Sequence, residues 1–166
     1  MIPVMSGRTI SKFTDQRVEN EALQALLRAA MEAPSAGDER PWHFIVLRDH
    51  TIRDTIRMAI PEAFMVTQTP VSIVLCGDTS LQKHIGCWPL DCAAATENIL
   101  IRARRMKLAA IWLGMYPIEG RIQHFRELLR IPEHVVPFSL IVVGHPTTWW
   151  EHGNRFLAAR VHHDRW

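Results

Sequence analysis

The sequence predicts an α+β fold in which helices flank a mixed central sheet. Segments with helical spacing of apolar residues alternate with short apolar runs that have the length of strands. Irregular spacers, such as residues 61–70 between two prolines, interrupt that alternation, so the chain does not follow a strict βαβ rhythm. With 166 residues, of which 48% are apolar, the chain is long enough for a single domain, residues 1–166, with its own core.

The first half of the chain contains two predicted helices and two predicted strands. Asn20 is a suitable N-cap, and leucines follow it at helical spacing. Pro61 ends the second helix, and Gly77-Asp78 closes the second strand. In order, we expect a helix at 20–33, a strand at 43–47, a helix from 49 or 51 to 60, and a strand at 71–76.

The second half begins with a helix of a different kind. From Asp91 to about residue 101, small residues occupy most of its circumference, which favours close packing against a neighbour in the core or at a subunit boundary. The remaining expected elements are a strand at 109–113 interrupted by Gly114, a helix at 122–129, and a strand at 138–143 stopped by Gly144-His145-Pro146.

The last segment, residues 147–166, is irregular and rich in aromatic residues. It holds three of the six tryptophans and three arginines without a clear periodicity. Such an arm needs a surface to pack on. Two alternatives are open: the arm embraces a second subunit, or it folds back on its own domain.

Composition argues against nucleic-acid and membrane partners. A formal charge of +2 leaves no basic surplus, and no apolar run approaches the roughly 18 residues that a membrane span needs. Cys76, Cys87 and Cys92 form an odd set in apolar surroundings, which is typical of free thiols in a reducing compartment. A zinc site that adds His84 matches no common ligand spacing. We therefore expect a cytoplasmic protein.

Three separated segments have the character of a binding site. Arg8, Thr9 and Ser11 place a guanidinium beside hydroxyls, which suits a phosphate. The loop at 34–42 is stiffened by two prolines and offers open backbone amides at small residues. Residues 112–117 form a strand end with a glycine. Each segment alone is more typical of an ordinary connector or a solvated surface charge. No nucleophile–base motif accompanies them, which favours chemistry carried by a cofactor.

Taken together, these segments resemble the FMN-dependent nitroreductase family, over nearly the whole chain from Arg8 onward. The loop looks like the signature Pro-Ser-x-x-Asn-x-Gln-Pro-Trp of that family. Residues 91–100 are similar to its long dimer-forming helix. Residues 131–137 and 144–146 resemble its closing strand, and 160–162 its C-terminal basic element.

The resemblance implies an intertwined homodimer with two FMN sites at the subunit interface and the arm, about residues 147–166, packed on the partner. FMN is the implied cofactor and NAD(P)H the implied electron donor. No side chain is implied as an acid or base, so no catalytic residue is assigned. The implied FMN-binding residues are Arg8, Thr9, Ser11 and Arg160 toward the phosphate, Pro34, Ser35, Ala36 and Asp38 in the loop, and Leu113, Gly114 and Met115 at the reactive edge of the ring.

The tetrapeptide Pro117-Ile118-Glu119-Gly120 spells a sequence that some family members use at the ring edge. Alignment of the preceding helix and strand assigns that position to Gly114 and Met115 instead. The chain departs from the family pattern at Gly7, Ser11, Asp38, Arg40 and Ala158, and the lost cations weaken the expected hold on the phosphate.

Two functions follow from the resemblance. The first is an oxidoreductase that uses NAD(P)H to reduce nitroaromatics, quinones or similar small electrophiles by a ping-pong mechanism. The second is a flavin-binding or flavin-derived dimer with weak or no turnover, in a storage, sensing or structural role.

Overall fold

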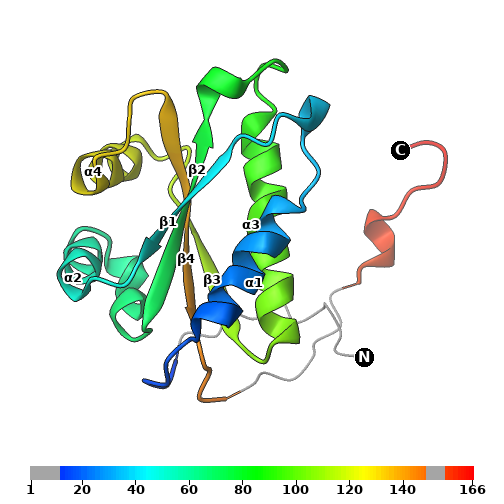
Figure 1. Cartoon of the computed structure of the whole chain (residues 1–166). Coiled ribbons are helices and arrows are strands. Elements are labelled where there is room, and N and C mark those ends of the chain that lie inside the picture. Colours follow the sequence, from blue (N-terminus) through cyan, green and yellow to red (C-terminus); the bar gives the residue numbers. More distant parts are fainter. Residues whose placement is uncertain (1–11, 149–155) are drawn as a thin grey trace.

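The computed structural model describes residues 12–148 and 156–166. Helices and strands alternate along the chain (Figure 1). The main elements are α1 (Asn20–Met31), β1 (Trp42–Leu47), α2 (His50–Ala59), β2 (Val71–Asp78), α3 (Trp88–Arg105), β3 (Ala109–Gly114), α4 (Glu119–Leu129) and β4 (Val135–Gly144). Short 3-10 turns lie at η1 (Ala36–Asp38), η2 (Pro61–Thr67), η3 (Thr79–Leu81) and η4 (Ala158–Arg160).

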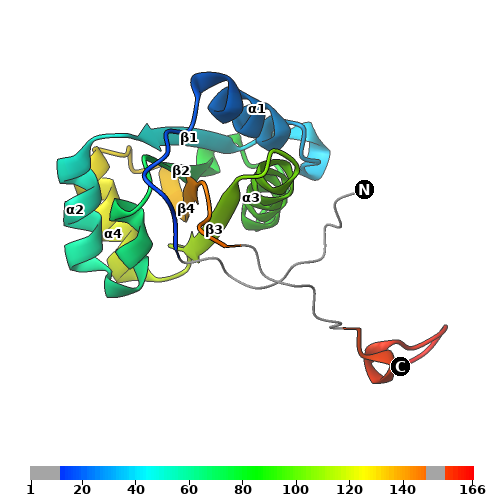
Figure 2. The same ribbon diagram turned by 90° about the horizontal axis from the view of Figure 1, so that it is seen from below.

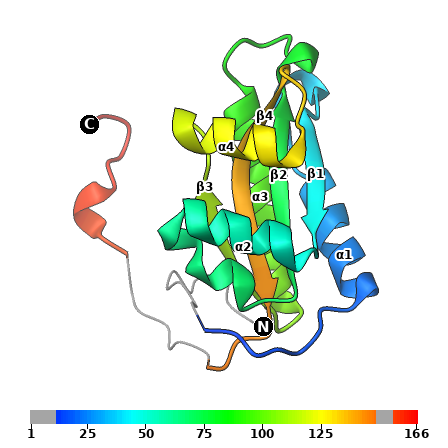
Figure 3. The ribbon, with the colours of Figure 1, turned by 90° about the vertical axis from the view of Figure 1, so that its left-hand side faces the viewer.

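The four strands form one sheet in the order β1-β2-β4-β3. Viewed along the sheet, α1 and α3 cover one face, and α2 and α4 cover the other (Figure 2). The face covered by α2 and α4 is seen directly in Figure 3. Helices on both faces of this sheet confirm the predicted α+β class.

The expected mixed sheet was wrong for the described strands, because all three strand pairings are antiparallel. Leu47 at the end of β1 pairs with Ser72 near the start of β2, so the segment between them returns to the end of the sheet that it left. By contrast, α3 carries the chain along the sheet from β2 to β3. Those two strands therefore run in the same direction, but β4 lies between them and no parallel neighbours result.

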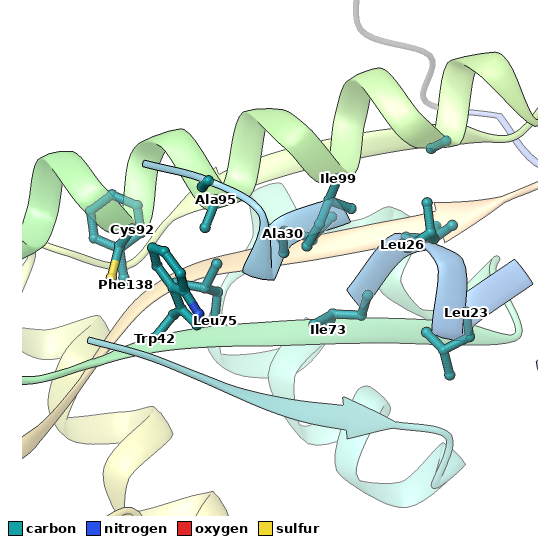
Figure 4. Packing of buried hydrophobic residues seen from close by; sticks show 14 of the residues in the cluster. Leu23, Leu26, Ala30, Trp42, Ile73, Leu75, Cys92, Ala95, Ile99 and Phe138 are labelled. Atoms are coloured by element: carbon teal, nitrogen blue, oxygen red, sulfur yellow. The ribbon is translucent and has the colours of Figure 1, made fainter. Parts of the chain in front are cut away.

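Both faces of the sheet bury apolar side chains, and all eight residues of β2 are buried. Between the sheet and the helices α1 and α3, Leu26 and Ala30 face Ile99 and Ala95, with Ile73 and Leu75 from the sheet below them (Figure 4). The small residues of α3 let α1 approach closely, as their distribution predicts. Phe125 and Met115 are buried in the second apolar core, which lies between the sheet and the helices α2 and α4.

Three elements begin three residues earlier than expected. α3 starts at Trp88 and includes Pro89, since a proline in the first helical turn lacks only an N–H that has no helical partner there. α4 starts at Glu119. β4 starts at Val135 and includes Pro137, which stands opposite Cys76 next to a register shift at Leu75/Cys76. A bulge accommodates a proline that a regular central strand would exclude.

The C-terminal segment 156–166 exposes every residue, including large apolar side chains. In all three views it lies apart from the sheet and its helices (Figures 1–3). The exposed apolar side chains are Phe156, Leu157, Val161 and Trp166. Residues 149–155 of the expected arm lie outside the described residues. In the described part of the chain, no helix is both long and apolar enough to cross a membrane.

Candidate functional site

The loop at 34–42 adopts an uncommon backbone conformation. Gly37, Asp38 and Arg40 all have positive φ angles, of 56°, 56° and 48°. Non-glycine residues rarely adopt this region, and such positions concentrate at functional sites. Local bonds hold the loop: the Arg40 N–H donates to Ser35 Oγ at 3.0 Å, and Arg40 Nε pairs with Asp38 Oδ1 at 2.7 Å. The cation at Arg40 therefore offsets the charge of the Asp38 carboxylate.

A buried aspartate at the start of α3 attaches the loop to the helix layer. The Ala36 N–H donates to Asp91 Oδ1 at 3.1 Å. The second oxygen, Oδ2, is buried and has no hydrogen-bond partner among the described residues. Asp91 thus fixes the middle of the loop, while Pro34 and Asp38 stay exposed and Ser35 is half-buried.

A second carboxylate attaches the loop to the segment that follows β2. Glu39 Oε1 accepts hydrogen bonds from the backbone N–H groups of Lys83 and His84, each at 2.8 Å, and lies 2.8 Å from the His84 ring nitrogen Nδ1. Burial raises the pKa of Glu39, but the bonds from His84 and Lys83 outweigh it, so the pKa lies below its ordinary value of 4.5. Glu39 is therefore ionised at neutral pH.

Gly114 ends β3 at an open edge of the sheet. The Met115 N–H donates to the Phe138 carbonyl at 2.9 Å, which makes the adjacent pair of Gly114 and Ser139 a non-hydrogen-bonded pair of the antiparallel ladder. The N–H and carbonyl of Gly114 therefore point away from β4. A Cβ at Gly114 would meet only the Tyr116 carbonyl, at 3.7 Å, so the backbone is open to a flat ligand. Met115 is buried, and its own amide is occupied.

Arg121 of α4 hydrogen-bonds to the Gly114 carbonyl on the side of β3 that faces away from β4. Its Nη1 donates to the Gly114 carbonyl at 3.0 Å, and Nη2 lies 3.2 Å from Glu62 Oε1 of η2. The guanidinium is largely buried, with 23% of the side chain exposed. It brings a positive charge next to the open strand edge, and sequence reasoning missed this residue. Its proximity to Gly114 depends on the path of the turn between β3 and α4, which Gly114 and Pro117 mark in the sequence without defining that path.

The tetrapeptide that alignment set aside lies at the start of α4. Within the described part of the chain, the amides of Glu119 and Gly120 have no carbonyl partner, as expected for the first turn of a helix. They are a second source of free N–H groups close in sequence to Gly114.

Aromatic side chains gather on the face of β3 that is turned toward α3. The rings of Trp88 and Tyr116 make an edge contact with centroids 4.9 Å apart, and Trp112 lies 5.8 Å from Phe138. Trp112 and Tyr116 each keep 38% of their surface exposed. These rings give the open edge a flat apolar surface beside polar backbone groups.

A single subunit does not join all the residues predicted for the site. The loop precedes β1 and Gly114 ends β3, so β2 and β4 separate them although both lie near the same end of the sheet. Arg8, Thr9 and Ser11 lie outside the described residues. η4, which carries Arg160, lies apart from both the loop and β3 (Figure 1).

Comparison with known proteins identifies the family. Residues 4–86 and 64–145 match the nitroreductase family. The chain belongs to the nitroreductase family. One relative is a Methanothermobacter thermautotrophicus protein named "Putative NADH dehydrogenase/NAD(P)H nitroreductase". It is 42% identical to this nitroreductase over 163 residues, which cover 98% of this chain and 85% of the relative.

Solved structures agree with this nitroreductase fold. A Parabacteroides distasonis protein of the same name has a TM-score of 0.93 at 38% identity, covering 98% of this chain and 96% of that one. A Desulfovibrio desulfuricans protein solved in complex with FMN has a TM-score of 0.81 at 26% identity, covering 96% and 92% of the two chains. The fold expected from the resemblance is confirmed.

Proposed function

We propose that this protein is a homodimeric oxidoreductase that binds FMN and uses NAD(P)H to reduce small electrophiles such as nitroaromatics and quinones, by a ping-pong mechanism. The observation that carries the proposal is the open edge at Gly114, where a free backbone N–H, the Arg121 cation and exposed aromatic rings lie together. Its membership of the nitroreductase family supports the same conclusion.

The residues at this edge fit the ring end of FMN. A flat heterocycle needs space against the backbone, and a Cβ built on Gly114 finds no close neighbour. In our assignment, Leu113, Gly114 and Met115 form the segment along the ring edge, with Gly114 supplying the backbone contact. Pro34, Ser35, Ala36 and Asp38 form the wall contributed by the other subunit. Arg8, Thr9, Ser11 and Arg160 hold the phosphate.

When bound, FMN supplies a two-electron carrier between NAD(P)H and the acceptor. The protein binds and orients the ring, and its fixed charges favour the electron-rich reduced form. Arg121 provides such a charge beside the strand edge, and Arg40 neutralises Asp38 in the loop. The exposed rings of Trp112 and Tyr116 offer planar acceptors an apolar surface. No side chain is assigned to proton transfer.

The dimer in this proposal joins the two halves of the site. The loop and Gly114 lie at opposite edges of the sheet, so a second copy is needed to bring a loop to each open edge. The C-terminal segment exposes Leu157, Val161 and Trp166, which is unfavourable in a monomer and favours packing on the partner. The chain then forms one domain, residues 1–166, with the arm reaching across.

The second candidate function, a flavin-binding dimer without turnover, is favoured by the departures at Gly7, Ser11 and Ala158, because each lost cation weakens phosphate binding. The two candidates differ in a simple assay. An oxidoreductase is yellow, or becomes yellow with added FMN, and its absorbance near 450 nm bleaches with NAD(P)H and returns with nitrofurazone or menadione. A yellow protein that NAD(P)H does not bleach has the second function. A protein that never takes up FMN is not the proposed oxidoreductase, and only a flavin-derived structural role then fits.

A further inference from the structure

The Glu39 side chain is completely buried although it belongs to an exposed loop. Its Oε1 atom accepts from two consecutive backbone N–H groups and lies beside the His84 ring. Its Oε2 atom is buried and has no hydrogen-bond partner among the described residues. Burying a carboxylate in this way is unfavourable unless its bonds compensate, so the side chain is a strong anchor point.

His84 closes the other side of this contact. A Cβ built on Gly37 would come within 2.6 Å of His84 Cε1 and 3.0 Å of Nδ1, so the ring lies directly against the glycine backbone. The ring keeps 57% of its surface in solvent. Gly37, which has a φ angle of 56°, therefore has no room for a side chain on the side that His84 occupies.

The contact joins two segments 45 residues apart in sequence. One is the loop in which two non-glycine residues, Asp38 and Arg40, have positive φ angles, a conformation that free peptides populate poorly at such residues. The other is residues 82–87, which connect η3 to α3 and carry Ile85 with 92% of its surface exposed. Asp91 holds the loop at Ala36, and the Asp78 N–H donates to the Pro41 carbonyl at 2.7 Å. Glu39 and His84 add an attachment between these two points.

We propose that Glu39 and His84 are positioning residues that hold the loop 34–42 in its binding conformation by fastening it to residues 82–87. For flavin binding, this inference rests on the proposed function, in which the loop forms one wall of the FMN site. The fastening itself concerns the protein without FMN. It also makes residues 82–87 part of the wall, because the two segments move together.

The test compares Glu39→Ala, Glu39→Gln and His84→Ala with the wild type by hydrogen exchange of the FMN-free protein, followed by FMN titration. Glu39→Ala removes all three bonds, so we expect exchange in peptides covering 34–42 and 82–87 to rise by about tenfold or more. His84→Ala leaves the two backbone bonds and has a smaller effect. Glu39→Gln keeps an acceptor oxygen, so its hydrogen exchange should be slower than that of Glu39→Ala. Glu133→Gln, an exposed carboxylate outside both segments, is the matched control.

FMN affinity then tests the positioning role. We expect Glu39→Ala to weaken FMN binding by about tenfold. The variants should rank in FMN affinity as they rank in hydrogen-exchange protection. Unchanged exchange in Glu39→Ala and His84→Ala overturns the fastening, whether or not FMN binds. Faster exchange with unchanged FMN affinity overturns the positioning role. If the wild type binds no FMN, the proposed function fails, and the exchange data still decide the fastening. Should Glu39→Ala not fold, His84→Ala and Glu39→Gln carry both comparisons.

Discussion

The guanidinium of Arg121 donates to the carbonyl of Gly114 at 3.0 Å, and this bond ties α4 to the open end of β3. The second guanidinium nitrogen faces Glu62 of η2 at 3.2 Å, so one side chain links the strand edge to both neighbouring elements. It places a fixed positive charge where the proposed site needs one. The site is therefore built by α4 as much as by the strand.

Replacing Arg121 with methionine leaves the Gly114 carbonyl without this donor. We expect a loss of about 1–3 kcal/mol in the free energy of unfolding, measured by urea denaturation. Arg121→Lys, which keeps the charge, should lose less. In the FMN-loaded protein, Arg121→Met should also lower the flavin midpoint potential, because a nearby cation favours the reduced form. Arg57→Met, at an exposed position of α2, is the control. A potential equal to that of the wild type would contradict the role of the charge.

Gly77 makes room for the Trp88 ring, since a Cβ at this position would overlap Trp88 Cε3 and Cζ3. Trp88 in turn contacts Tyr116 beside the open edge. Gly77→Ala should cost about 1–3 kcal/mol in unfolding free energy and shift Trp fluorescence. The matched control is Gly120→Ala on α4, where a Cβ meets nothing within 4 Å and helix propensity favours alanine. Equal stability of the two variants would show that Trp88 does not need the space.

The pKa of Glu39 is below its ordinary value of 4.5 in the folded protein, since the bonds from His84 and Lys83 outweigh burial. An acid with a lowered folded-state pKa contributes stability that is complete above the unfolded-state pKa and is lost as the pH falls through the folded-state pKa. We therefore expect stability and loop protection to decline below about pH 4.5.

The loss of stability at acidic pH should be smaller in Glu39→Gln than in the wild type. Asp78, whose pKa is lowered because bonds from Ser80 outweigh burial, contributes in the same sense to both proteins. Glu97, whose pKa burial raises, contributes in the opposite sense to both. The difference between the two stability–pH curves therefore isolates Glu39. Parallel curves would mean that Glu39 is not ionised in this contact.

Cysteine reactivity should divide the three free thiols. Burial raises the pKa of Cys76 to about 12 and that of Cys92 further, whereas Cys87 is half-buried. With a thiolate-specific reagent at pH 8, one thiol should react in the native protein and three in denaturant. Cys87→Ser should remove the native reaction. Rapid reaction of all three in the native protein would show that the core around β2 opens readily.

Deletion of residues 156–166 should convert the proposed dimer to a monomer and abolish FMN retention, because the segment's apolar side chains are exposed in one subunit. Sedimentation of the full and shortened chains measures this directly. A shortened chain that stays dimeric and keeps FMN would mean that the arm is not needed for assembly.

The sequence predicted most of the fold because its main elements are marked by local periodicity. The helix periodicity after Asn20 and the apolar run at 71–76 both correspond to observed elements. The mixed sheet could not be rejected in advance, since strand direction depends on where α3 carries the chain. The loop at 34–42 stood out through its prolines. The attachment of the loop by Glu39 could not be predicted, because a contact between residues 45 positions apart leaves no local pattern in the sequence.

The most direct test of the central proposal is a crystal structure of the protein grown with FMN. We predict one FMN per subunit in a homodimer, with the ring between the Gly114 edge of one subunit and the loop 34–42 of its partner. A structure in which FMN is absent, or lies within one subunit away from both of these segments, would contradict the proposal.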